Sequence, residues 1–527
     1  MTEGDVVPVK GGVRSGGLAR VVAVLVLAGL VVGACSDDQG SESVDGATGE
    51  ATTTARPAYE PAFEPGPCDP ERVPPAPAVV ECGNLVVPED RSDPDRAEVR
   101  LPVAIVRSSA ADRKPDPIVY FSGGPGYPGV EASRGFTALP LAPDRDLIVF
   151  DQRGTGAATP DLECPEYDDA SLTFFETNDR AGVEVERQLD ALEGCGRRLT
   201  EAGVDLDHYD TPTIAADVAD LRDALEIEEW NLFGASYGTA VALEVLRSHP
   251  EGVRSAVIDS VVPPDRPFNF SDDFREARRV FDELFEGCAA SSECAAAYPD
   301  LEADFDEVVA VLDADPYPKT ITSMSRPVTA RFTGADLVAG AWNAMYDTEL
   351  IPLIPFFVAQ LAEGNRSVID PVAERGLEFI TGAAEGQTVA VVCADGQEGV
   401  DIDELRESMS SEPKYSTLVT VQPVPLACDA FDVESNDDGW GEIPEATVPV
   451  LVFGNQYDPV TPPEDSERTA EALGDLATYV YFAGLGHGAT GSHPCPLSIF
   501  QAFVATPADS VDSSCAATMP EPAWVVG

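Results

Sequence analysis

Three polar residues, far apart in the chain, have the side chains that nucleophilic catalysis requires. They are Ser236 in Gly-Ala-Ser-Tyr-Gly, Asp458 in Asn-Gln-Tyr-Asp-Pro and His487 in Gly-Leu-Gly-His-Gly. A serine hydroxyl is a poor nucleophile at neutral pH unless a base within hydrogen-bond reach takes its proton. An imidazole can be that base, and a carboxylate then holds the imidazole in the correct tautomer. The three residue types therefore indicate a candidate hydrolytic triad.

The segment around Ser236 predicts how its hydroxyl is presented. An apolar stretch from Trp230 ends in Leu232 and Phe233, and Ala, Val and Leu recur at helical spacing from there to Pro250. This pattern predicts a strand, a sharp turn and a helix, with glycines beside the serine where side chains would collide. The Gly-x-Ser-x-Gly motif is common by chance in a Gly-rich chain, so the flanking pattern carries the prediction.

The other two candidates each follow a predicted strand. Asp458 comes after the apolar run at 448–454, and His487 comes after the run at 478–482. Alternating strands and helices build a mostly parallel sheet whose sites lie at the carboxyl ends of the strands. We therefore expect an α/β fold with all three candidates at one sheet edge. Further strands are predicted at 99–107, 118–121, 147–150 and 256–259, and a helix at 214–225.

The alternation stops near residue 266, where mainly helical patterns begin without a clear run of buried strands. An insertion of this length predicts a separate lid over the site. The helical patterns lie at 274–288, 301–312, 335–346, 354–361 and 401–409. The expected organisation is a lipoprotein signal peptide at 1–34, a flexible tether at 35–66, the first part of the core at 67–265, the helical lid at 266–445 and the second part of the core at 446–527.

The N-terminus has the features of an export signal. Lys10, Arg14 and Arg20 precede an apolar stretch at 21–32, which is too short to span a bilayer as an anchor. The ending Val-Gly-Ala-Cys resembles a bacterial lipoprotein box, in which Cys35 becomes the lipidated first residue. The alternative is an ordinary cleaved signal with an incidental cysteine. We expect an exported protein of the cell envelope or the exterior whose only membrane contact is this lipid anchor.

The remaining cysteines favour an oxidising compartment. Eleven cysteines are present, and without Cys35 an even number remains, which suits five disulfides. Sequence alone does not set their connectivity. Pairing neighbours along the chain predicts Cys68–Cys82, Cys164–Cys195, Cys288–Cys294, Cys393–Cys428 and Cys495–Cys515.

The composition argues against several classes of partner. The 93 acidic and 33 basic residues give a formal charge of −60, which disfavours nucleic acid and anionic lipid head groups. The four histidines form no His-Glu-x-x-His motif and the cysteines form no Cys-x-x-Cys motif. We therefore expect neither a metal site nor a cofactor. The oligomeric state stays open.

Together, these motifs resemble those of the α/β-hydrolase peptidases, in particular the bacterial proline iminopeptidase and tripeptidyl aminopeptidase family. The long lid, the even number of cysteines and the lipoprotein-like start favour the exported tripeptidyl aminopeptidase-like branch. Many members have His before Gly-Gly-Pro-Gly, whereas this chain has Ser122. The matching segments are Gly123-Gly124-Pro125-Gly126, Asp151-Gln152-Arg153-Gly154-Thr155-Gly156, Gly234-Ala235-Ser236-Tyr237-Gly238 and the loops of Asp458 and His487.

The resemblance implies a role for each matched residue. Ser236 is expected to be the nucleophile, His487 the general base and then acid, and Asp458 its orienting partner. The N–H groups of Gly124 and Tyr237 are expected to bind the tetrahedral oxyanion. Acidic lid residues bind the substrate α-ammonium in this family, so Asp395 is a candidate for that contact. An exposed loop acid with no such role is the alternative at Asp395.

Other residues compete for these roles. Asp259 also ends a predicted strand and is the rival triad acid. His493 is a rival base, although its place at a helix start favours a cap, and His249 suits the helix C-terminus. Asp151 and Arg153 are expected to form an internal ion pair that braces a loop.

The expected function is therefore that of an exported serine exopeptidase acting through an acyl-enzyme. It would release tripeptides, other short peptides or residues from the N-terminus of a peptide or small protein. A carboxylesterase or lipase on the same triad is one alternative. A non-catalytic envelope scaffold is another, because this architecture hosts many functions.

Overall fold

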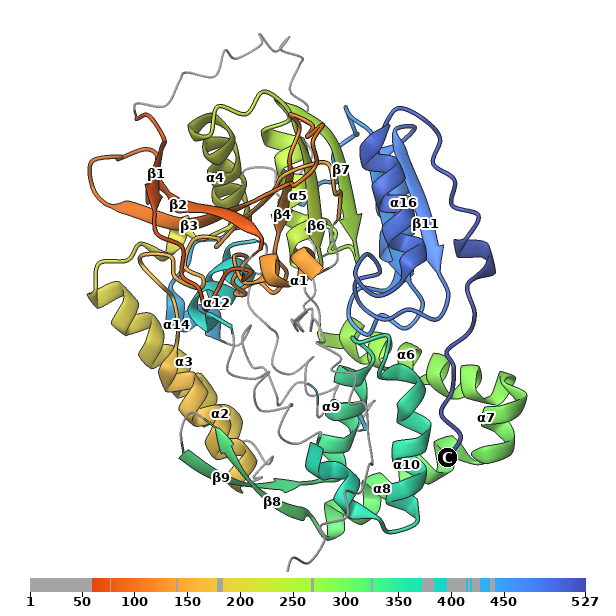
Figure 1. Cartoon of the computed structure of the whole chain (residues 1–527). Coiled ribbons are helices and arrows are strands. Elements are labelled where there is room, and N and C mark those ends of the chain that lie inside the picture. The colour runs from red at the N-terminus through yellow and green to blue at the C-terminus, as the bar shows by residue number, and fades with distance from the viewer. Residues whose placement is uncertain are drawn as a thin grey trace, which may run out of the picture.

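The described chain forms a large sheet with flanking helices above a mainly helical lid (Figure 1). The computed structural model describes residues 59–75, 77–138, 141–177, 183–266, 270–323, 326–371, 383–395, 414–415, 418, 427–436 and 441–527. The signal peptide, Cys35 and the helix expected at 401–409 lie outside these residues. None of the described helices is both long and apolar enough to cross a membrane.

The sheet is mostly parallel. Its order in the described residues is β1-β2-β3-β5-β4-β6-β7-β10-β11, with antiparallel pairing from β1 to β5 and parallel pairing from there to β11. The central strands are buried along their whole length, which explains their unbroken apolar runs. The α/β class is therefore confirmed. The strands are β1 (Ala62–Gly66), β2 (Val79–Pro88), β3 (Glu98–Arg107), β4 (Ile118–Phe121), β5 (Leu147–Phe150), β6 (Trp230–Ala235), β7 (Val253–Asp259), β10 (Val450–Asn455) and β11 (Ala477–Phe482).

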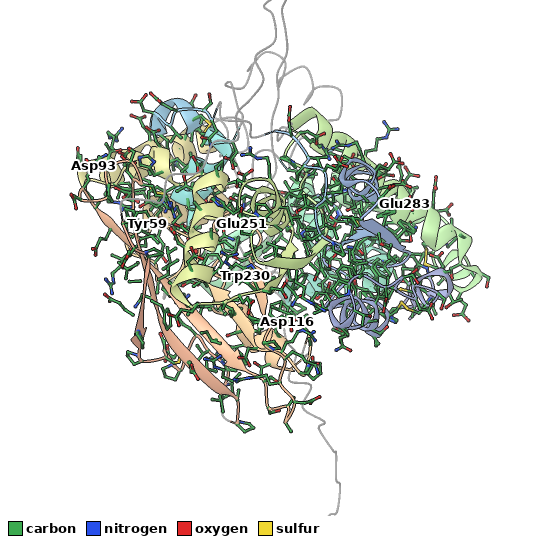
Figure 2. The ribbon with its side chains drawn as sticks, turned by 90° about the horizontal axis from the view of Figure 1, so that it is seen from above. Tyr59, Asp93, Asp116, Trp230, Glu251 and Glu283 are labelled. Atoms are coloured by element: carbon green, nitrogen blue, oxygen red, sulfur yellow. A yellow bond between two sulfur atoms is a disulfide. The ribbon has the colours of Figure 1, made fainter. Side chains whose placement is uncertain are left out.

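Helices cover both faces of this sheet. Apolar residues of α4 (Thr211–Ala224), α5 (Tyr237–Ser248) and α15 (Pro463–Leu473) form one core with the strands. Those of α1 (Ala132–Ala138) and α16 (Pro494–Ala505) form the other. Asp116, Trp230 and Glu251 stand just before or at the starts of β4, β6 and β7, and they lie in a row across the sheet (Figure 2). The amino ends of these strands therefore share one edge, so their carboxyl ends share the opposite edge.

One half of the lid has its own apolar core. It contains α6 (Phe270–Ala290), α7 (Ser292–Ala297), α8 (Leu301–Ala314), α9 (Gly334–Ala344), η2 (Ile351–Leu353), α10 (Ile354–Ala362) and η3 (Arg366–Ile369). It also contains an antiparallel hairpin of β8 (Tyr317–Ser323) and β9 (Arg326–Phe332), which the sequence did not indicate, within a lid that is otherwise helical as expected. Thr320 and Thr329 face each other across this hairpin, a polar pair that carries no signal of a buried strand.

A second group of helices shares a separate apolar cluster. The helices α2 (Pro165–Thr177) and α3 (Val183–Glu201) belong to the first part of the core, and α12 (Glu385–Ala394) and α14 (Cys428–Phe431) belong to the lid. Figure 1 shows α12 and α14 beside α3. Residues of α2, α3, α12 and α14 share one apolar cluster. The short helices η1 (Leu206–His208) and η6 (Ala516–Thr518) complete the described elements.

Five disulfides join the described cysteines. The bonded pairs are those obtained by joining sequence neighbours, Cys68–Cys82, Cys164–Cys195, Cys288–Cys294, Cys393–Cys428 and Cys495–Cys515. The boundary expected for the tether is wrong at its C-terminal end, because β1 at Ala62–Gly66 pairs with β2. Tyr59 is also held, since Arg91 donates a hydrogen bond of 2.9 Å to its hydroxyl.

Candidate active site

Ser236 occupies the sharp turn between β6 and α5. Its φ of 56° lies in the left-handed region, which is rare for a residue other than glycine. A Cβ on Gly234 would lie 2.2 Å from the Gly238 carbonyl oxygen, and one on Gly238 would lie 2.1 Å from that of Phe121. Only glycine fits at both positions, because the turn is pressed against its own helix and against β4. The serine hydroxyl is thereby held at the carboxyl edge of the sheet.

Asp458 and His487 are in direct contact. His487 Nδ1 lies 2.8 Å from Asp458 Oδ2, and both side chains are fully buried. The same carboxylate accepts hydrogen bonds from the Thr461 N–H at 2.8 Å and the Thr461 hydroxyl at 2.7 Å. Burial raises the pKa of the Asp458 carboxyl, but His487 and the bonds from Thr461 outweigh burial, so its pKa lies below the usual value. Asp458 is therefore ionised at neutral pH.

This contact determines which nitrogen of His487 can act as a base. An ionised Asp458 only accepts hydrogen bonds, so Nδ1 of the neutral imidazole carries the proton. Nε2 then has a free lone pair. It is buried and has no hydrogen-bond partner among the described residues, and no bond to the Ser236 hydroxyl is formed there. The arrangement provides a proton acceptor for an incoming reactant.

Asp259, the rival acid, has a different position. Its carboxylate accepts hydrogen bonds from the N–H groups of Ala489 and Thr490 at 3.0 and 2.8 Å. Its backbone carbonyl accepts a bond of 3.0 Å from the Ser236 N–H. Asp259 thus joins the turn of Ser236 to the loop that follows His487. Its side chain holds that loop and does not contact the imidazole through any hydrogen bond of the described residues.

The lid packs directly on His487. The ring of Tyr346 lies edge-on to the imidazole at a centroid distance of 5.0 Å. A Cβ on Gly486 would lie 2.2 Å from the Met345 carbonyl oxygen, so this position requires glycine. The Trp342 indole N–H donates a bond of 3.1 Å to the Pro459 carbonyl beside Asp458. The end of α9 therefore shields the acid–base pair from water and holds both of its loops.

The loop after β4 lies against Ser236. A Cβ on Gly123 would lie 3.4 Å from the Ser236 hydroxyl oxygen. Gly124, an expected oxyanion donor, has a φ of 112°, which side chains disfavour. The Ser122 hydroxyl donates a bond of 2.9 Å to the Tyr127 carbonyl, so this serine closes the loop.

Asp395 is buried at the C-terminal end of α12, so the alternative of an exposed loop acid is wrong. The Thr211 N–H lies 3.3 Å from each carboxylate oxygen, the Thr211 hydroxyl donates a short bond, and the Asn436 amide donates one of 3.2 Å. Burial raises the pKa of this carboxyl well above its ordinary value, and the nearby Asp210 raises it further. Most of its acceptor capacity is used within the protein.

Glu385 is an acidic lid residue that the sequence did not reveal as a site residue. It begins α12, is buried, and has its pKa raised to about 8 by burial and by Asp168. No hydrogen bond to its carboxylate comes from the part of the chain that the structure describes. The neighbouring Ala384 N–H donates a bond of 2.9 Å to the Gly126 carbonyl, which places Glu385 beside the loop of Gly124. In sequence, a Glu in the first turn of a helix is ordinary.

Asp151 and Arg153 do not form the expected ion pair with each other. Asp151 pairs with Arg72 at 2.7 Å, and Arg153 pairs with Asp217 through two bonds of 2.7 Å. The two side chains therefore brace different neighbours.

The rival histidines are structural. His493 is the N-cap of α16, where its Nδ1 accepts a bond of 3.2 Å from the Cys495 N–H, so the cap is confirmed. His249 ends α5, but burial and Arg91 lower its pKa. Its ring is therefore uncharged at neutral pH and does not offset the helix dipole. Within the described residues, no group of His, Cys, Asp or Glu is arranged to hold a metal ion.

Comparisons with known proteins agree with the α/β architecture of the chain. The family described as the alpha/beta hydrolase fold matches residues 116–317, and that described as TAP-like protein matches residues 416–515. The chain is 27% identical over 422 residues to the serine protease Hip1 of Mycobacterium tuberculosis, covering 76% of this chain and 80% of that protein. It is 25% identical over 471 residues to the tripeptidyl aminopeptidase of Streptomyces coelicolor, covering 84% of each. The match to the solved proline iminopeptidase of Mycobacterium smegmatis covers 80% of this chain and 96% of that chain, at 15% identity. Its TM-score of 0.37 is too low for a comparison of sites.

Proposed function

The chain belongs to the α/β hydrolases and is related to tripeptidyl aminopeptidases, and from this premise we propose that it is an exported serine exopeptidase acting on free peptide N-termini. The observation that carries the proposal is the Asp458–His487 pair, with Nε2 free, at the sheet edge that also carries Ser236. The products are short peptides, tripeptides foremost.

In the proposed mechanism, the Ser236 hydroxyl attacks the scissile carbonyl while His487 Nε2 takes its proton. The tetrahedral oxyanion accepts hydrogen bonds from the N–H groups of Tyr237 and Gly124. The protonated imidazole then donates to the leaving amine, and an acyl-enzyme forms on Ser236. A water molecule then attacks the acyl carbon while His487 takes a proton from it. The imidazole returns this proton to the Ser236 oxygen, and the acyl product leaves as a carboxylic acid. Serine–histidine hydrogen bonds are often loose before substrate binds, so the free Nε2 is compatible with this sequence.

We assign recognition of the N-terminal ammonium to Glu385 in place of Asp395. An exopeptidase that acts on free N-termini must bind an ammonium at a fixed distance from the scissile bond, and a buried carboxylate without a cationic partner meets that need. Glu385 is such a group beside the Gly124 loop, whereas the acceptor capacity of Asp395 is largely used by Thr211 and Asn436.

The disulfides support export, because such bonds persist in oxidising compartments. We propose that Cys35 carries the lipid anchor. A Cys35→Ser variant is expected to be recovered from the medium, whereas the wild type stays with the membrane fraction. Recovery of both in the membrane fraction would contradict the anchor.

The function is tested with tripeptidyl p-nitroanilides that differ only in a free or acetylated N-terminus. We expect the free form to react about 100-fold faster in kcat/KM, because acetylation removes a charged hydrogen bond of about 3 kcal/mol. Ser236→Ala should abolish cleavage. Equal rates for both forms would contradict N-terminal recognition, and hydrolysis of p-nitrophenyl esters alone would favour the carboxylesterase or lipase. Failure of a fluorophosphonate to label Ser236 would favour the non-catalytic scaffold.

A further inference from the structure

Helix α12 contacts the loop of the Gly124 donor directly and reaches the Tyr237 donor through Thr211. At its N-terminal end, the Ala384 N–H donates a bond of 2.9 Å to the Gly126 carbonyl, and the Thr388 hydroxyl donates one of 3.0 Å to the Pro125 carbonyl. At its C-terminal end, Asp395 accepts hydrogen bonds from Thr211, the first residue of α4. A single lid helix therefore spans from one donor loop to the neighbour of the other.

The C-terminal contact continues to Tyr237. The Thr211 hydroxyl lies 2.7 Å from the Tyr237 hydroxyl and also donates to Asp395 Oδ2. A threonine hydroxyl has one proton, so the oxygen that gives it to Asp395 accepts the proton of Tyr237. The result is a directed chain from Tyr237 through Thr211 to Asp395. All three side chains are buried, so water does not replace a missing member.

The N-terminal end of α12 supports the glycine-rich loop at 123–126. The segment 123–126 contains three glycines, and Gly124 and Gly126 have positive φ values of 112° and 102°. A Cβ on Gly126 would lie 2.4 Å from the Thr388 hydroxyl oxygen, which shows how closely α12 approaches. Glycine-rich backbone is flexible, and oxyanion donors act only when they are held about 2.7 to 3.1 Å from the developing charge. The loop therefore needs support from outside.

We propose that α12 positions the oxyanion hole, with Thr388 acting through the Pro125 carbonyl on the Gly124 donor, and Asp395 acting through Thr211 on the Tyr237 donor. This inference rests on the proposed function of Ser236. The disulfide Cys393–Cys428 lies two residues before Asp395 and ties this end of α12 to α14. The helix is thus anchored independently of the loops that it supports.

The variants that test the inference remove single hydroxyl groups and leave the backbone donors in place. We expect Tyr237→Phe, Thr211→Val and Thr388→Val each to lower kcat by about tenfold and to leave KM within about twofold, because oxyanion contacts strengthen in the transition state. Thr211→Ser keeps the hydroxyl and should retain wild-type kcat. The control is Thr469→Val in α15, whose buried hydroxyl has no partner among the described residues.

Combining variants separates the two ends of α12. Thr211→Val with Tyr237→Phe should lose no more than either alone, since they interrupt one chain. Thr388→Val with Tyr237→Phe should multiply the two losses, since they act on different donors.

The deciding measurement is the rate at which a fluorophosphonate labels Ser236, because its phosphoryl oxygen uses the same donors and no peptide is required. Slower labelling of Thr211→Val and Thr388→Val, with unchanged melting temperature and restored labelling in Thr211→Ser, supports the inference. Wild-type labelling rates in both valine variants overturn it. A wild type that is labelled but cleaves no peptide contradicts the proposed function alone.

Discussion

The Asp259 carboxylate accepts two hydrogen bonds from Thr490, one from its N–H at 2.8 Å and one from its hydroxyl at 2.7 Å. Thr490 lies three residues after His487, so an acid at the end of β7 holds the loop of the imidazole that follows β11. Asp458, by contrast, contacts the imidazole itself at 2.8 Å. Of the two buried acids, Asp458 therefore orients the imidazole ring and Asp259 holds the loop that carries it.

The variants Asp458→Asn and Thr490→Val distinguish the roles of these two acids. We expect Asp458→Asn to lower kcat by about 10⁴-fold, because an amide no longer selects the imidazole tautomer with the proton on Nδ1. Thr490→Val removes one bond to Asp259 and leaves the N–H bond, so kcat should fall less than about tenfold. Steady-state kinetics on one tripeptidyl amide checks both. A larger loss in Thr490→Val than in Asp458→Asn would make Asp259 the catalytic acid.

Asp458 also links stability to acid pH. Its folded pKa lies below the unfolded value of about 3.9, so its stabilising contribution is present above that pH and is lost as pH falls through the folded pKa. The melting temperature of Asp458→Asn should therefore lie below that of the wild type by a constant amount from about pH 5 to 8, and the difference should shrink below about pH 4. A difference that grows on acidification would contradict this linkage.

Glu385 should make the folded protein less stable as pH rises, which is the opposite of the effect of Asp458. Its folded pKa of about 8 exceeds the value of 4.5 for an exposed glutamate, so the unfolded chain loses this proton first and stability falls as pH rises between the two values. Each pH unit in this range costs at most about 1.4 kcal/mol. Glu385→Gln should gain melting temperature relative to the wild type from pH 5 to 8. Its kcat/KM for free N-termini should fall about 100-fold and that for acetylated substrates should not change.

The C-terminal segment reaches the loop of Asp458 through Trp524. This side chain is 8% exposed and lies edge-on to the ring of Tyr457, the residue before Asp458, at 6.4 Å. Trp524→Ala should destabilise the protein by about 3 to 5 kcal/mol, because it leaves a large cavity, and should lower kcat as the Asp458 loop loosens. Chemical unfolding and kinetics measure the two effects. The exposed neighbour Val526 is the control, since Val526→Ala should change neither.

The sequence by itself determined the elements that carry the triad candidates. The apolar runs that form β4, β5, β6 and β10 are buried on both faces. Such unbroken runs lack the alternation of apolar and polar residues that a surface helix shows. The glycines around Ser236 were also informative, because steric exclusion at a sharp turn depends on neighbours in the chain. Pairing cysteines that are neighbours in sequence gave the correct disulfides for a similar local reason, because closing a short loop costs little entropy.

The tertiary structure alone decided which acid does which task. Asp259 and Asp458 both follow buried strands, and only the loops that reach them, from Thr490 and from His487, distinguish their roles. The same holds for Arg153, which meets Asp217 and not Asp151, and for Asp395, whose partners lie in α4 and near α14. Local sequence encodes the strand, turn and helix, because these depend on near neighbours. Hydrogen bonds between loops depend on how those elements pack. The distance in space between two such loops cannot be read from their separation along the chain.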